Sequence, residues 1–114
     1  MAAEAREAVF GFLSGLHPAP PAHISQNLVL LVSELVTNAL RHAGGVTVLR
    51  LTADRRCLEV AVADPSPAHP QDRTPDLTGR GGGFGWPMVR RLARTVEVSP
   101  RPDGGKVVSA TLVR

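Results

Sequence analysis

Three polar side chains, Glu34, Asn38 and Arg41, lie on one stripe of a segment whose pattern predicts a helix over residues 24–43. At 100° per residue, Asn38 lies about 40° from Glu34 around the helix axis and Arg41 about 20° to the other side. Apolar residues fill the adjoining stripe, which is expected to face the core: Ile24, Leu28, Leu31, Leu35 and Ala39. A carboxylate, an amide and a guanidinium at the edge of a buried face are suited to bind phosphate and a metal ion. The alternative is a solvated polar face whose Glu–Arg spacing merely supports the helix.

A glycine-rich segment, Gly81-Gly82-Gly83-Phe84-Gly85, leads directly into a second amphipathic stretch. Glycines at alternate positions allow the backbone to approach phosphate groups closely. The backbone N–H groups at the start of the following helix then favour an anion. Together with the helical stripe, this segment predicts a site for a nucleoside triphosphate and its metal ion. A lid hinge would need the same glycines, and the two roles are compatible.

The elements that must position these residues can be read from periodicity and turn signals. Asp64 follows a strand-like run, and four prolines between residues 65 and 80 predict a long loop that acts as a lid or is disordered. The order of the predicted helices and strands indicates an α+β fold, a two-layer sandwich with helices over one face of a largely antiparallel sheet. The predicted helices are residues 2–16, 24–43 and 84 or 86–94, and the predicted strands are 46–51, 58–63, 96–98 and 106–113.

Length and composition indicate one soluble globular domain over residues 1–114, with 43% hydrophobic and 20% charged residues. The single cysteine, Cys57, excludes an internal disulfide. We expect a cytoplasmic protein without a membrane partner, because no apolar run is long enough to span a bilayer and the N-terminus lacks a signal pattern. The net charge of +3 suits phosphate binding, but the basic residues form no dense block, so nucleic acid is not expected as a partner.

The motifs resemble those of a known family, the GHKL ATPases, over roughly residues 24–112. The run SELVTNALRHA at 33–43 is similar to the family's N-box, in the form found in bacterial anti-sigma-factor serine kinases. The run DPSP at 64–67 lies where the family has its first glycine box, and GGGFGWPMVRRL at 81–92 matches the second. The resemblance implies a Bergerat-type sandwich that binds ATP and Mg²⁺ between its helices, under an ATP lid at about 65–84.

The resemblance also implies roles for residues on the first motif. Asn38 would be the Mg²⁺ ligand, and Glu34 the base that activates an attacking hydroxyl, although Glu34 could instead orient a metal-bound water. Arg41 would contact phosphate. His42 would either bind a phosphate oxygen or cover the helix end, where the helix dipole favours a cation.

Asp64 would accept the exocyclic amine of adenine and so distinguish adenine from guanine, whereas an Asp before proline could also simply begin a turn. Ser66 stands where the family has a glycine, as it does in relatives among the anti-sigma kinases. The expected ATP-binding residues in the second glycine box and just before it are Gly79, Arg80, Gly81, Gly83, Phe84 and Gly85. The family usually has a threonine before the last strand that supports the adenine aspartate, and here Val107 follows Gly104-Gly105-Lys106.

The implied function is an ATP-dependent serine/threonine kinase that phosphorylates an anti-anti-sigma protein and also sequesters a sigma factor. One alternative is a non-catalytic ATP-binding regulatory module. Another is the detached catalytic domain of a two-component histidine kinase, although His17 and His23 beside prolines are poor phosphate acceptors. The resemblance also implies a homodimer. Related kinases usually carry one or two strands ahead of the first helix, and this sequence starts with that helix, so the dimer is left open as an expectation.

Overall fold

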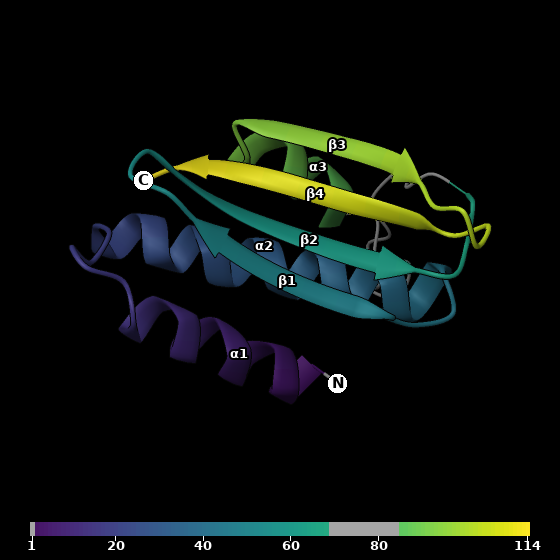
Figure 1. Cartoon of the computed structure of the whole chain (residues 1–114), viewed down its shortest axis with the longest axis horizontal. Helices are drawn as coiled ribbons and strands as arrows, with labels where there is room; N and C mark the ends of the chain where they lie inside the picture. The colour runs from purple at the N-terminus through teal and green to yellow at the C-terminus, as the bar shows by residue number, and fades with distance from the viewer. Residues whose placement is uncertain (1, 69–84) are drawn as a thin grey trace, which may run out of the picture.

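The computed structural model describes residues 2–68 and 85–114. In this part of the chain, three helices and four strands follow one another in the predicted order (Figure 1). The helices are α1 (Ala2–Ser14), α2 (Ala22–His42) and α3 (Gly85–Leu92), and the strands are β1 (Val48–Ala53), β2 (Cys57–Asp64), β3 (Thr95–Pro100) and β4 (Lys106–Val113).

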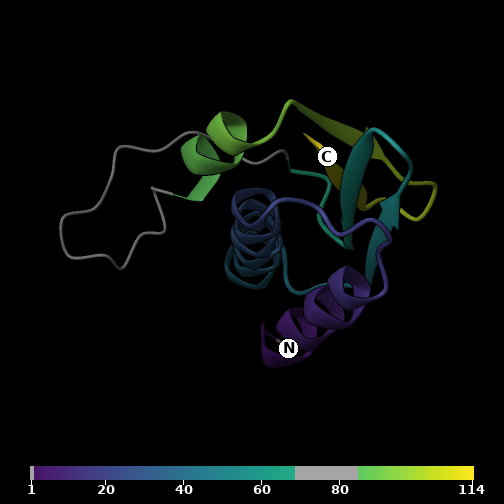
Figure 2. The same cartoon turned by 90° about the vertical axis from the view of Figure 1, so that its left-hand side faces the viewer.

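The four strands form one sheet in the order β1-β2-β4-β3, and every neighbouring pair is antiparallel. The helices lie on one side of this sheet, and the other side carries no helix among the described residues (Figure 2). The predicted α+β sandwich is therefore confirmed.

Strand alternation decides which side chains meet the helices. On β2, Leu58, Val60 and Val62 are buried, because they point toward α2, whereas Glu59 between them is exposed. The facing stripe of α2 supplies the other half of this core with buried residues that recur at helical spacing: Leu28, Leu31, Val32, Leu35, Val36 and Ala39. The predicted apolar stripe of this helix is thus the one that the sheet covers.

Two glycines end α2 at the predicted place. Gly44 has a φ of 83° and Gly45 a φ of 131°, conformations that residues with a Cβ rarely adopt. The turn lets the Gly45 N–H donate to the carbonyl of Ala39 at 3.0 Å, so a carbonyl in the last turn of the helix keeps a partner. Just before β1 begins, the Thr47 N–H donates to the Ala63 carbonyl at 2.8 Å.

The strands differ from the prediction at their ends, because pairing rather than composition sets their length. The strand β3 runs over 95–100 rather than 96–98, since each of its residues has a partner on β4 from Thr111 to Lys106. In the same way, β1 ends at Ala53, opposite Leu58. Asp54 closes the turn that follows, where its Oδ1 accepts the N–H groups of Arg56 and Cys57 at 2.7 Å each.

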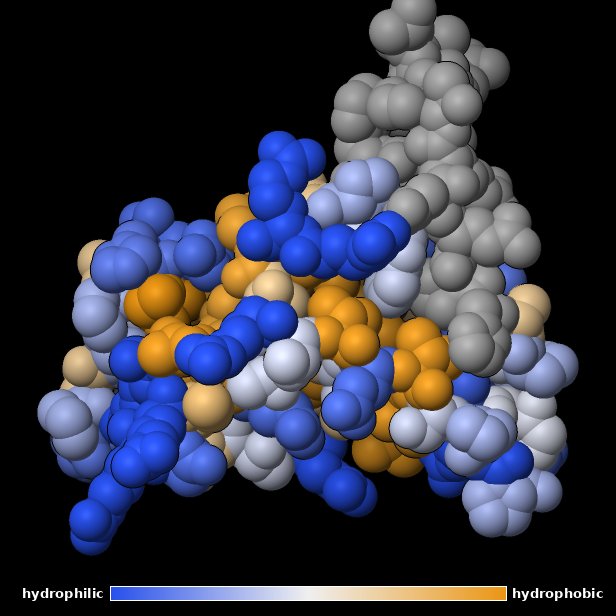
Figure 3. Space-filling view, turned by 90° about the horizontal axis from the view of Figure 1, so that it is seen from above, coloured by the Kyte–Doolittle hydropathy of each residue, from blue (hydrophilic) through white to orange (hydrophobic). Residues whose placement is uncertain are grey.

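The surface carries both hydrophobic and hydrophilic side chains (Figure 3), as the composition of 43% hydrophobic and 20% charged residues predicts. Seen from above, hydrophobic side chains are interrupted by hydrophilic ones (Figure 3). Within residues 2–68 and 85–114, none of the helices is both long and apolar enough to cross a membrane.

Candidate functional site

The polar stripe of α2 lies where the sequence predicted, along the border of the buried face. Glu34 and Asn38 are half-buried, next to the buried Leu35 and Ala39. Arg41, one turn further on, is exposed, and so is His42 at the end of the helix. A carboxylate and an amide in this position are partly removed from water and still reachable, which suits a binding site.

The C-terminal end of α2 lies beside the segment that follows β2. A Cβ placed on Gly44 would lie 3.7 Å from the ring of Pro65, the residue after Asp64. Asn38 lies four residues, or about 6 Å of helical rise, before His42, the last residue of α2. The fold therefore brings the predicted metal ligand and the predicted adenine-binding residue to the same end of the sheet.

Asp64 is the last residue of β2, and its side chain is only 3% exposed. Its Oδ1 accepts the backbone N–H of Ser66 at 2.9 Å, which folds the chain back at Pro65. The Ser66 hydroxyl accepts the N–H of Ala68 at 3.2 Å and continues this turn. A carboxylate buried this deeply requires a compensating charge or donors.

Lys106 provides that charge. Its ammonium Nζ lies 2.9 Å from Asp64 Oδ1 and 3.2 Å from the carbonyl oxygen of Ser66, with 5% of the side chain exposed. Asp64 and Lys106 are direct partners across β2 and β4. Lys106 is also the only lysine of the sequence, since the other 12 of the 13 basic residues are arginines.

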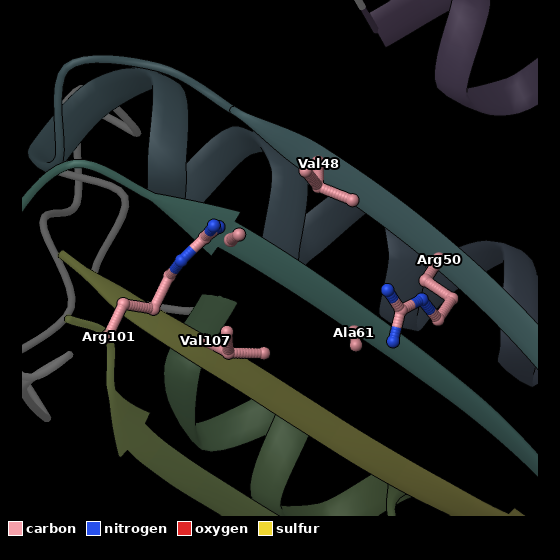
Figure 4. A pocket seen from close by; sticks show the side chains of 6 residues that line it. Val48, Arg50, Ala61, Arg101 and Val107 are labelled. Carbon is pink, nitrogen blue, oxygen red and sulfur yellow. The ribbon is translucent and has the colours of Figure 1, made fainter. Parts of the chain in front are cut away.

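This ion pair was not predicted from the sequence, because the family pattern places the side chain that supports the aspartate at the position of Val107. Val107 instead lines a hollow of about 260 Å³ on the sheet face away from the helices, together with Val48, Ala61, Ala63, Arg50 and Arg101 (Figure 4). Strand alternation could have revealed the error. Val108, Ala110 and Leu112 on β4 form the core, so Lys106, two residues before Val108, must point to the helix side as well.

A glycine permits the close approach that forms the pair. A Cβ on Gly105 would lie 2.1 Å from the Asp64 carbonyl oxygen and 3.1 Å from the Pro65 Cα, distances that the backbone could not accommodate without shifting. The Gly105 N–H is held by Asp103 Oδ1 at 2.9 Å. The absence of a side chain at Gly105 thus lets β4 begin directly against Asp64, with Lys106 next to it.

The second glycine box lies largely outside the described residues. The predicted lid beyond residue 68 lies outside the described residues. So do five of the predicted nucleotide-binding residues: Gly79, Arg80, Gly81, Gly83 and Phe84. Gly85 is described as the first residue of α3. This helix has Pro87 in its first turn, where proline is tolerated, and buries Val89 in the core.

Asn38 is suited to the metal role on chemical grounds. Its amide oxygen is a hard neutral donor, and Mg²⁺ commonly takes only one or two protein ligands and completes its octahedron with phosphate oxygens and waters. Within the described ranges, no three His, Cys, Asp or Glu side chains gather as a metal cage. The role of Asn38 remains a prediction.

Comparison with known proteins adds one finding. A sequence model of the histidine kinase-like ATPase domain matches residues 2–112, which is nearly the whole chain. A search of curated proteins gave no match.

Proposed function

Because the chain belongs to the family of histidine kinase-like ATPase domains and is therefore an ATP-binding, kinase-like domain, we propose that it is a serine/threonine protein kinase of the anti-sigma-factor type. Its substrate would be a serine of an anti-anti-sigma protein, and its phosphate donor would be ATP with Mg²⁺. The observation that carries the proposal is the half-buried Glu34, one helical turn before the predicted metal ligand Asn38.

Residues of α2 and the last residue of β2 would together bind Mg·ATP. Asn38 would hold Mg²⁺, and the metal ion would supply positive charge that neutralises the phosphate oxygens. Arg41 faces solvent beyond it, and its guanidinium fork suits a phosphate. Asp64 binds the adenine amine at the end of β2.

Glu34 is the proposed general base. Its carboxylate accepts the proton of the serine hydroxyl as the bond from the serine oxygen to the γ-phosphorus forms. The bond from that phosphorus to the bridging oxygen breaks, and ADP leaves with the electron pair. Such a base needs partial burial, because full hydration would weaken its contact with the hydroxyl, and Glu34 is half-buried.

Transfer of labelled phosphate tests the proposal. Purified chain with Mg·ATP should phosphorylate a serine of an anti-anti-sigma protein from the same cell. Glu34→Gln keeps the shape of the side chain but removes the base, so transfer should fall by about 10²–10⁴-fold while ATP binding is retained. The matched control is Glu59→Gln, because Glu59 is an exposed glutamate on the other face of the sheet.

The alternatives predict different outcomes. If Glu34→Gln transfers phosphate as fast as the parent, Glu34 is not the base. If the parent binds ATP but transfers phosphate to no candidate, the non-catalytic regulatory module becomes the better account. Transfer to a histidine of another protein would identify a detached histidine kinase domain.

A further inference from the structure

The proposed function assigns adenine binding to Asp64 alone and gives no role to Lys106, its partner in the buried ion pair. We propose that Lys106 is a second base-reading residue, whose ammonium donates a hydrogen bond to the ring nitrogen N1 of adenine while Asp64 accepts from the 6-amino group. The inference rests on ATP binding at this site, as proposed above.

Among the described residues, the ammonium of Lys106 keeps one N–H that can donate a hydrogen bond to adenine. A lysine ammonium has three N–H donors, and its two acceptors within the described ranges are Asp64 Oδ1 at 2.9 Å and the Ser66 carbonyl oxygen at 3.2 Å. On the carboxylate, the bonds from Ser66 and Lys106 both end on Oδ1. The described residues therefore leave Oδ2 for a donor on the base, next to an ammonium with one N–H for an acceptor.

The two groups complement adenine in chemistry as well as in position. An ionised carboxylate only accepts hydrogen bonds, and an ammonium only donates them. Adenine presents a donor, its 6-amino group, beside an acceptor, N1. Guanine reverses this order, with the acceptor O6 beside the donor N1–H, so a base docked in the same orientation would meet like groups. Two adjacent contacts of fixed polarity discriminate more strongly than Asp64 alone.

Lysine is suited to this position in a way that the other basic residues of the chain are not. Its ammonium is compact and carries its donors on one atom, whereas a guanidinium is a planar fork. Lys106 reaches the carboxylate from the opposite position on the neighbouring strand, where Gly105 allows the two backbones to approach closely. If the role of Lys106 were purely structural, it would neutralise Asp64 without contacting the base.

Titration with altered purines separates these roles without changing the protein. The full chain is titrated with ATP, with 1-deaza-ATP, which lacks the N1 acceptor, and with 7-deaza-ATP, which lacks an acceptor on the opposite edge of the base. Because 1-deaza-ATP loses a hydrogen bond from a charged donor, it should bind about tenfold or more weakly than ATP. The compound 7-deaza-ATP should bind as ATP does.

A variant then attributes the effect to Lys106. In folded Lys106→Met, ATP and 1-deaza-ATP should bind alike, whereas Arg50→Met, altered on the opposite face of the sheet, should discriminate as the parent does. The proposal is overturned if the parent binds ATP and 1-deaza-ATP equally, or if Lys106→Met keeps the full difference. If no ATP binds to the parent, the proposed function fails first and this inference fails with it.

A second measurement covers the case in which Lys106→Met does not fold. Because Lys106 is the only lysine, a sample grown with isotopically labelled lysine gives one side-chain ammonium signal in NMR. ATP should shift this signal more than 1-deaza-ATP does at saturation. Identical shifts with both nucleotides would contradict the assignment.

Discussion

Removing the ammonium of Lys106 should be among the most damaging single changes in this chain. Lys106→Met keeps an unbranched side chain of similar length but leaves the Asp64 carboxylate, 3% exposed, without its charge partner. The Ser66 N–H would remain as its one donor among the described residues. Because a buried charge without compensation is costly, the folded state loses stability while the unfolded state does not.

The size of the effect follows from the burial of both partners. Removal of one member of a buried ion pair typically costs about 3–5 kcal/mol of unfolding free energy. Small domains have only about 5–15 kcal/mol in total, so the loss would be a large fraction of it. The double variant Lys106→Met/Asp64→Asn removes both charges and should therefore be more stable than Lys106→Met alone.

Urea denaturation at neutral pH, followed by circular dichroism, measures these differences. The matched control is Arg101→Met in the same β3–β4 hairpin, because the Arg101–Asp103 pair is 3.6 Å long and has side chains 30% and 59% exposed. That variant should lose less than about 1 kcal/mol. If Lys106→Met loses no more unfolding free energy than this control, or if the double variant is less stable than Lys106→Met, Lys106 does not stabilise the fold by neutralising Asp64.

Four further changes test other parts of the site and fold. Asp64→Asn should reduce the preference for ATP over GTP in binding titrations, and equal binding of the two nucleotides by the parent would contradict the adenine assignment. Asn38→Ala should weaken Mg²⁺-dependent ATP binding with the circular dichroism spectrum unchanged, and metal-independent binding by the parent would exclude the metal role. Gly105→Ala should lose about 1–3 kcal/mol of unfolding free energy, because its Cβ would overlap the Asp64 carbonyl oxygen. Hydrogen bonds from the N–H groups of Arg56 and then Cys57 lower the pKa of Asp54 below 3.8. The contribution of Asp54 to stability is therefore present above that pH and is lost as the pH falls through the folded-state pKa. In Asp54→Ala, the unfolding free energy should fall less steeply with acidification than in the parent.

Local patterns in the sequence were sufficient to predict the elements and their faces. The spacing of Leu28, Leu31 and Leu35 specified the buried stripe of α2, and Gly44 specified its end. These predictions hold because they depend on helical periodicity and on backbone conformation, which a single segment determines. The placement of Glu34 and Asn38 at the edge of the core follows from the same periodicity.

Predictions that depend on pairing between distant strands were less accurate. The length of β3 is set by β4, and the partner of Asp64 lies 42 residues away along the chain. Motif spacing alone directed attention to Val107, whereas the register of β2 and β4 places Lys106 opposite Asp64. Strand alternation indicates that Lys106 points to the helix side, but only the register between β2 and β4 places it opposite Asp64, and local sequence does not contain that register.

We propose that ATP bound at this site is a phosphoryl donor rather than only a regulatory ligand. The most direct measurement is a single-turnover reaction in which the chain, saturated with γ-labelled Mg·ATP, is mixed with the anti-anti-sigma protein and the phosphorylated residue is identified by mass spectrometry. We expect the label to appear on a serine of that protein as ADP forms. Label that stays in ATP while calorimetry shows the nucleotide bound would contradict it.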